Sequence, residues 1–197
     1  MKTKNFVETK KLKISILIFA LFINVLSYGQ KFTLTPEGLK NSENTEQSYV
    51  VIQIEGKSAK QLFDNAKRYI IQTYKNPDLV QKGTIENEYI KFETYIPYIA
   101  TINAGLTKIK YDASYVTELN FKDGKIKFEI INLEMKTTDG VPLNITPQGA
   151  LSGWYIYNKK GVLKQEITKQ EIESYFNEQI ISLSSYLKGE TNENENW

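Results

Sequence analysis

Hydrophobic and polar residues alternate most regularly between positions 114 and 134, on both sides of Asp123-Gly124. A two-residue Asp-Gly turn accepts the positive φ angles that tight hairpins require, so this segment predicts a β-hairpin. The resulting register places apolar pairs on one face and polar pairs on the other. The expected pairs are Phe121 with Ile126, Leu119 with Phe128, Thr117 with Ile130, Asn120 with Lys127, and Lys122 with Lys125.

A second pattern, apolar residues at three- and four-residue spacing, predicts a helix after Ser58. Ser58 and Gln61 have the spacing of a capping box, in which each side chain satisfies a backbone amide at the start of the helix. Asn76-Pro77 is expected to end this helix, because proline disfavours helical geometry at the preceding residue. The buried face is expected to hold Ala59, Leu62, Phe63, Ala66, Ile70 and Tyr74.

The same spacing predicts a final helix up to Lys188. Thr168 is its expected N-cap and Glu171 the other half of a capping box, with Ile167 packing on Ile172 as a hydrophobic staple. Gly189 is well placed to end it. The expected buried stripe is Ile172, Phe176, Ile180, Leu183 and Leu187.

The remaining apolar and β-branched segments predict strands at 30–34, 49–54, 79–86, 89–96 and 154–157, separated by loops at 41–48, 97–107 and 136–148. Strands clustered between two helices indicate an α+β fold of order β-α-β4-α, a curved antiparallel sheet with two helices packed on one face. We expect a single domain at 49–188, preceded by an N-terminal segment, 30–48, that contributes an edge strand. The acidic, Asn-rich tail 189–197 is expected to be disordered.

The first 29 residues have the pattern of a secretory signal peptide. Five lysines precede an apolar run from Ile14 to Leu26, and small residues at Ser27 and Gly29 favour cleavage before Gln30. A spanning helix needs about 20 apolar residues, so this run is too short to serve as a retained anchor. The chain has no cysteine to carry a lipid, which excludes a lipoprotein. We therefore expect export to the periplasm or the cell exterior, with no membrane span after cleavage.

Removing this segment changes the charge. The whole chain carries 25 basic and 23 acidic residues, and residues 1–29 hold five lysines and one glutamate, which leaves 20 basic and 22 acidic residues. The net charge of the mature chain is then −2, with Arg68 as its one arginine. Nucleic-acid binding needs a cationic surface, commonly with arginine forks on phosphate or guanine. The sequence therefore argues against a nucleic-acid partner.

The chain contains neither cysteine nor histidine. Thiol and imidazole catalysis and the usual zinc and copper sites are thereby excluded, and no Asp-x-Asp-x-Asp-Gly calcium loop is present. We expect no metal and no cofactor. Carboxylate pairs remain as candidate acid–base groups, either Glu86 with Glu88 or Asp112 with Glu129. Because acidic residues are rarely buried, we interpret Glu88, Glu93 and Glu129 as solvated strand positions.

Between residues 49 and 134 the chain resembles a bacterial family of exported domains of unknown function with a TBP-like fold. The resemblance rests on the strand Val50–Ile54, the segment from Gly56 to Phe63, Asn76-Pro77, and the hairpin Asp123-Gly124-Lys125-Ile126-Lys127. It implies a curved sheet with two helices and implies no activity and no DNA binding, because function does not follow from topology.

Aromatic residues are plentiful near the predicted sheet, and three of them border irregular segments: Tyr95, Tyr98 and Trp154. Their rings combine an apolar body with a polar tip, which suits a contact surface for a protein, peptide or glycan. The first hypothesis is a non-enzymatic binding module that uses the outer face of the sheet or the loops 97–107 and 136–154. The alternative is a carboxylate-dependent hydrolase that acts on envelope glycans.

Overall fold

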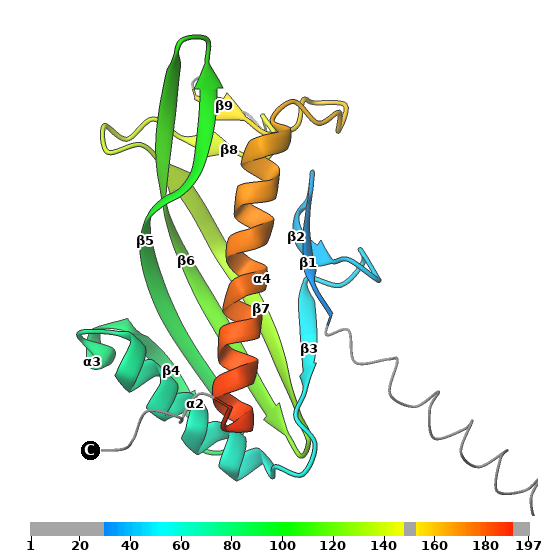
Figure 1. Ribbon diagram of the computed structural model, residues 1–197, viewed down its shortest axis with the longest axis vertical. Coiled ribbons are helices and arrows are strands. Elements are labelled where there is room, and N and C mark those ends of the chain that lie inside the picture. Colours follow the sequence, from blue (N-terminus) through cyan, green and yellow to red (C-terminus); the bar gives the residue numbers. More distant parts are fainter. Residues whose placement is uncertain (1–29, 148–152, 191–197) are drawn as a thin grey trace, which may run out of the picture.

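The computed structural model describes residues 30–147 and 153–190, and the predicted signal peptide and residues 191–197 of the predicted tail lie outside these ranges. An antiparallel sheet of order β3-β7-β6-β5-β4 forms the centre of the molecule (Figure 1). Its strands are β3 (Tyr49–Gln53), β4 (Gln81–Ile85), β5 (Tyr89–Ala104), β6 (Thr107–Lys122) and β7 (Lys125–Lys136). The α+β class and the number and order of the five central strands along the chain are as predicted.

Helix α2 (Ala59–Thr73) and helix α4 (Glu166–Lys188) cover one face of this sheet (Figure 1). Phe63 of α2 contacts Phe121 of β6, and Phe176 of α4 contacts Tyr115 of the same strand, both edge to face. The inward residues of the strands alternate with solvated ones, and they form one hydrophobic core with the two helices. The predicted packing of both helices on one face is confirmed.

The local signals at the two helix ends are also confirmed. Ser58 and Gln61 form both hydrogen bonds of the capping box at the start of α2. Gly189 ends α4 in the left-handed conformation, with φ 86°. Pro77, however, does not simply follow α2: it begins a short third helix, α3 (Pro77–Val80), so the strand expected from residue 79 starts at Gln81. Proline at the first helical position loses no hydrogen bond, which explains this start.

The predicted N-cap of α4 is wrong. The helix begins at Glu166, after Gln165, and Thr168 and Glu171 lie inside it. Both side chains bind Thr101 of β5 instead: Thr168 donates its hydroxyl to the Thr101 carbonyl, and the Glu171 carboxylate accepts from the Thr101 N–H at 2.6 Å. Ile167 is 54% exposed rather than a buried staple. The Thr168 and Glu171 side chains, which were expected to cap the helix, therefore form tertiary hydrogen bonds with β5 instead.

The hairpin at Asp123-Gly124 has the predicted register at all five pairs. The expectation of an irregular 97–107 segment is wrong, because β5 continues to Ala104 and turns directly into β6. Pro97 lies in a β-bulge. Ile96 pairs with Ala113 and Ala100 with Tyr111, so residues 97–99 oppose a single residue of β6. Proline is tolerated at such a bulge because no ladder hydrogen bond is required there.

The N-terminal segment does not add an edge strand to the main sheet. It forms its own hairpin of β1 (Phe32–Thr35) and β2 (Gly38–Asn41), which lies against α4 (Figure 1). A small parallel pair, β8 (Leu143–Asn144) and β9 (Trp154–Tyr155), replaces the loop and single strand expected there. Within the described ranges, no helix combines the length and the apolar character needed to cross a membrane.

Candidate functional site

The central sheet has a gap along one edge of β7. Strand β3 pairs with β7 only between Lys125 and Glu129. At the other end, Lys136 forms a bridge to Pro142, next to β8. In the described part of the chain, β7 therefore has no neighbouring strand on that side between residues 130 and 135. Unpaired strand edges are natural sites for adding another extended segment.

A second bulge shapes β7 in this gap. Ser114 pairs with Glu134 and Val116 with Ile131, so Asn132 and Leu133 together oppose one residue of β6. Asn132 takes a positive φ of 53°, which asparagine tolerates better than most residues. The extra residue shifts the alternation of inward and outward side chains along β7 by one position. Leu133 and Met135, instead of the even-numbered residues, now turn toward the interior.

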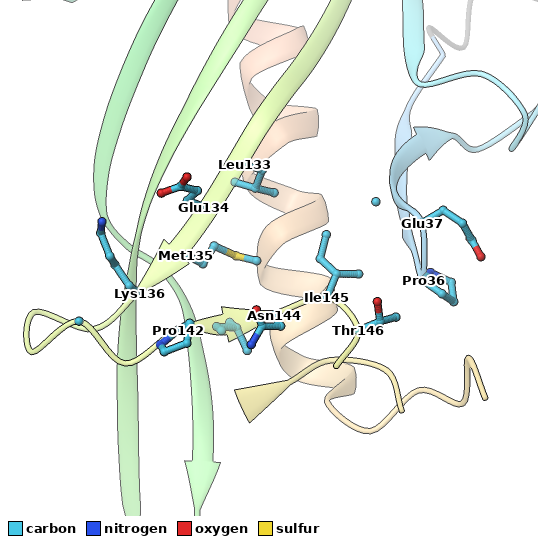
Figure 2. A pocket seen from close by; sticks show the side chains of 13 residues that line it. Pro36, Glu37, Leu133, Glu134, Met135, Lys136, Pro142, Asn144, Ile145 and Thr146 are labelled. Carbon is cyan, nitrogen blue, oxygen red and sulfur yellow. The ribbon is translucent and has the colours of Figure 1, made fainter. Parts of the chain in front are cut away.

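A pocket of about 450 Å³ lies beside this gap, and we call it the β7 slot (Figure 2). Three segments that are far apart in the sequence enclose it: the β1–β2 turn, the end of β7, and the chain around β8. Figure 2 shows the turn with Pro36 and Glu37 on the opposite side of the opening from Leu133, Met135 and Ile145, with the Glu37 side chain directed outward. The full lining is Pro36, Glu37, Gly38, Leu133, Glu134, Met135, Lys136, Gly140, Pro142, Leu143, Asn144, Ile145 and Thr146.

The chemistry of the β7 slot suits binding. Its walls combine aliphatic and proline side chains with polar ones, and three charged residues line it: Glu37, which is exposed, Glu134 and Lys136. The slot falls in the size range of ligand pockets, about 300–1,000 Å³. Its lining contains one hydroxyl, that of Thr146. Such a surface receives apolar side chains and favours a positive charge near Glu37.

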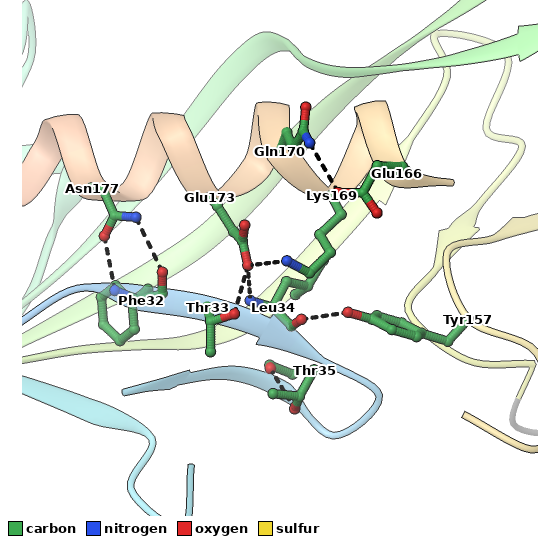
Figure 3. A network of polar contacts seen from close by, with 11 residues as sticks. Phe32, Thr33, Leu34, Thr35, Tyr157, Glu166, Lys169, Gln170, Glu173 and Asn177 are labelled. Atoms are coloured by element: carbon green, nitrogen blue, oxygen red, sulfur yellow. Dashed lines mark hydrogen bonds and ion pairs between the residues drawn. The ribbon is translucent and has the colours of Figure 1, made fainter. Parts of the chain in front are cut away.

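One wall of the slot is the β1–β2 turn, and side chains of α4 hold this hairpin in place (Figure 3). Asn177 accepts from the Phe32 N–H at 2.8 Å and donates to the Phe32 carbonyl at 3.1 Å, so its amide acts as a neighbouring strand would. Glu173 accepts from the Leu34 N–H and from the Lys169 ammonium, each at 2.7 Å.

Glu173 is partly buried. Burial raises the pKa of its carboxyl, but hydrogen bonds from Lys169, Thr33 and the Leu34 N–H outweigh that effect and lower it below the ordinary 4.5. The hairpin is therefore fixed to α4 by an ionised carboxylate as well as by an amide.

The structure brings two of the three predicted aromatic residues together. Tyr95 donates its hydroxyl to Asp112 at 2.6 Å, and the N–H of Tyr98 donates to the other oxygen of the same carboxylate at 3.0 Å. The hydrogen bond from Tyr95 and then that from Tyr98 lower the pKa of Asp112, and Asp112 raises the pKa of Tyr95. Tyr98 has φ 59° in the β5 bulge, and Lys110 lies over its ring at 4.5 Å.

Both tyrosine rings remain accessible, with 63% of Tyr95 and 62% of Tyr98 exposed. Tyr98 also borders a shallow groove of about 410 Å³ along α4. Trp154 is placed differently: it lies half-buried on β9, where it pairs with Leu143 and packs against the core. Tyr95 and Tyr98 thus share one cluster, and Trp154 belongs to another sheet.

Strand register connects the tyrosine cluster with the β7 slot. Tyr95 pairs with Ser114, which pairs with Glu134, and Asp112 pairs with Lys136. Neighbouring strands lie about 4.8 Å apart, so Tyr95 is roughly 10 Å from the slot strand. The two features therefore lie at the same end of the sheet.

On the rest of the outer face of the sheet, the polar side chains bind one another. Lys91 pairs with Glu118 at 3.4 Å, and Tyr89 donates to the same carboxylate at 2.7 Å. Lys127 pairs with Glu129 at 2.8 Å. These charged groups already have partners within the sheet, so this part of the face resembles a solvated surface.

The candidate carboxylate pairs do not have the geometry of a glycosidase. Glu129 pairs with Glu118, six residues along β6 from Asp112, a separation of about 20 Å at 3.3 Å per residue. Glycosidase carboxyls lie about 5–9.5 Å apart. Glu86 and Glu88 lie exposed around the β4–β5 turn.

Glu129 is partly buried, not fully solvated as predicted. Burial raises its pKa, but hydrogen bonds from Lys127 and Ser48 prevail and lower it, whereas a general acid needs a raised pKa. In the described part of the chain, no three acidic side chains are placed to hold a metal ion.

The sequence pattern did not point to the slot residues of β7 and of the β1–β2 turn. The predicted binding loop 136–154 does contribute Lys136, Gly140 and residues 142–146 to the lining. Leu133, Met135 and Pro36 have the ordinary appearance of core and turn residues. The Asn132 bulge, which turns Leu133 and Met135 inward, has no sequence signal beyond an asparagine in a strand.

No protein-family model matches the chain, and no curated protein matches it. Two solved structures are similar. One is a DUF4468 family protein from Bacteroides ovatus, 16% identical, with a TM-score of 0.48 over 72% of this chain and 87% of that chain. The other is a TBP-like protein from Parabacteroides distasonis, 12% identical, with a TM-score of 0.46 over 70% of this chain and 90% of that chain.

Proposed function

We propose that the chain is exported by residues 1–29, released by cleavage after Gly29, and active in the periplasm or outside the cell as a binding module. The lysine-rich start, the short apolar run and the small residues before Gln30 support export. The absence of cysteine and histidine from the sequence and the wide separation of Asp112 and Glu129 favour binding over catalysis.

The ligand we propose is an extended peptide segment that adds a strand to β7 in the β7 slot. The observation that carries this proposal is the stretch of β7 that has no strand partner on one side among residues 30–147 and 153–190, beside a preformed pocket. Main-chain hydrogen bonds to an open strand edge supply affinity, and pockets for alternate side chains supply specificity. Leu133, Met135 and Ile145 suit an apolar side chain, and Glu37 favours a basic residue next to it.

Tyr95 and Tyr98 extend the contact surface under this proposal. The Asp112 carboxylate holds both residues while their rings stay exposed. Amphipathic rings that are already ordered lose little conformational entropy on binding. Under this proposal they contact the part of a partner that continues past the slot at the same end of the sheet.

The test is selection of short peptides from a displayed random library against the wild-type protein, followed by calorimetry on the enriched sequences. Glu37→Trp places an indole at the slot rim without altering the backbone hydrogen bond that the turn makes to Thr35. Glu43→Trp is the matched control, because Glu43 is equally exposed and does not line the slot.

We expect Glu37→Trp to weaken binding at least tenfold, equivalent to about 1.4 kcal/mol, and Glu43→Trp to leave it unchanged. Enriched peptides that bind both variants equally, or a library from which nothing enriches, would contradict the proposed slot function.

A further inference from the structure

Gln30 makes one specific contact with the body of the protein. Its side-chain oxygen accepts a hydrogen bond of 2.7 Å from the backbone N–H of Val51. Val51 lies on β3, one of the two edge strands of the central sheet, so this N–H belongs to the open side of the strand. The side chain of Gln30 therefore occupies a position that a neighbouring strand would otherwise fill.

Cleavage after Gly29, on which this inference rests as part of the proposed function, makes Gln30 the first residue of the mature chain. A glutamine in that position carries a free α-amine within reach of its own side-chain amide carbon, since attack closes a five-membered ring. The reaction needs no oxidant or cofactor. The only outside requirement is the removal of the residues that precede Gln30.

We propose that Gln30 is a modification site at which the mature chain cyclises to an N-terminal pyroglutamate, with the N–H of Val51 assisting the closure. The α-nitrogen forms a bond to Cδ, and negative charge develops on Oε1 in the tetrahedral intermediate. The Cδ–Nε2 bond then breaks, and one proton passes from the α-nitrogen to the departing nitrogen, which leaves as ammonia.

Val51 is placed to assist because its N–H already points at Oε1, the atom on which the charge develops. A backbone N–H aimed at such an oxygen stabilises the intermediate in the manner of an oxyanion hole. The carbonyl oxygen of the lactam is the former Oε1, so the product keeps an acceptor for Val51. Cyclisation therefore retains the edge contact of β3 while it removes the terminal positive charge and blocks aminopeptidases.

The experiment begins with the full chain, which purified signal peptidase cleaves in detergent to give a defined starting time. Intact mass and N-terminal sequencing then follow the product. We expect residues 30–197 with a mass lower by one ammonia and an end resistant to sequencing. Residues 30–197 with a free glutamine would overturn cyclisation and leave export standing. Failure to cleave after Gly29 would instead overturn the proposed export, so the two failures are distinguishable.

The role of Val51 is tested by rate. Val51→Pro removes the N–H at an edge position, where proline is tolerated, and Val51→Thr keeps it as the matched control. We expect ring closure at least tenfold slower in Val51→Pro than in Val51→Thr or the wild type, because one oxyanion donor commonly contributes ~100-fold or more in a rigid site. If Val51→Pro fails to fold, the rate of ring closure in the folded wild-type chain is compared with the rate in the wild-type chain unfolded in urea. Equal rates in the folded and unfolded chain would exclude assistance by Val51.

Discussion

Replacing Asn177 with leucine tests how the N-terminal hairpin is attached to the domain. Leucine has the same number of side-chain heavy atoms and the same branching, but it can neither accept from the Phe32 N–H nor donate to the Phe32 carbonyl. Only 2% of Phe32 is exposed, so water replaces these bonds poorly. An unsatisfied buried polar group costs about 1–3 kcal/mol, and the loss of both bonds should lower the free energy of unfolding by about 2–4 kcal/mol.

Urea unfolding followed by circular dichroism measures this change, and thermal unfolding provides a second reading. For a domain of this size, about 2–4 °C of Tm accompanies each kcal/mol, so the melting temperature should fall by about 5–15 °C. Asn177→Asp keeps the acceptor and loses the donor, so its loss of stability should lie between those of the wild type and Asn177→Leu.

Gln170→Leu is the matched control, because Gln170 is exposed on the same helix and its one side-chain bond is to Glu166. It should change stability by no more than about 0.5 kcal/mol. An Asn177→Leu protein as stable as this control would refute the idea that the Asn177 amide replaces a neighbouring strand for β1.

Three further perturbations have defined outcomes. The folded-state pKa of Glu173 is lowered below 4.5, so the stability that its charge contributes is complete above that pH and is lost as the pH falls through the folded pKa. Urea unfolding between pH 2 and 6, roughly the titration range of a carboxyl, measures this loss of stability. Glu173→Gln should make the loss smaller. Asp112→Asn should bring the raised pKa of Tyr95 back toward 10.0, visible in an NMR titration of the ring carbon, and an unchanged titration would exclude the contact. Gly153→Ala places a Cβ against the carbonyl oxygen of Pro142 and should destabilise the fold by about 2–4 kcal/mol, whereas Gly140→Ala, with open space around it, should cost only about 1–2 kcal/mol of left-handed strain. Equal losses of stability in urea unfolding would contradict the clash at Gly153.

The features predicted correctly from the sequence are those whose cause is local. Asp123-Gly124 determines a turn and therefore a register, and Ser58 with Gln61 determines a helix start within one turn of chain. Gly189 likewise ends α4 through its own backbone freedom. In each case the residues that decide the structure are within a few positions of one another.

The incorrect predictions concern contacts between distant segments. Thr168 and Glu171 have the spacing of a capping box, but Thr101 offers both groups a partner on β5. Pro97 suggests the end of a strand, yet pairing with β6 on both sides of the bulge carries β5 past it. In each instance a tertiary hydrogen bond or strand pairing outweighs a valid local preference.

The candidate site was only partly predictable for the same reason. Of the three aromatic residues predicted to form a contact surface, Trp154 is half-buried against the core, whereas Tyr95 and Tyr98 are exposed. Their shared carboxylate could not be foreseen, because Asp112 reaches them through the register of the β5 bulge. The β7 slot depends on where β3 begins and on a positive φ at Asn132, and neither is encoded by a pattern of apolar positions.

The proposed binding of an extended segment in the β7 slot is tested most directly by amide hydrogen exchange on the wild-type protein, with and without a peptide selected from the library. A strand added to β7 should slow exchange of the amides between residues 130 and 135, because their N–H groups on the open edge gain acceptors. Protection confined to that stretch is the predicted result. Unchanged exchange there, with the peptide bound and protection elsewhere, would contradict it.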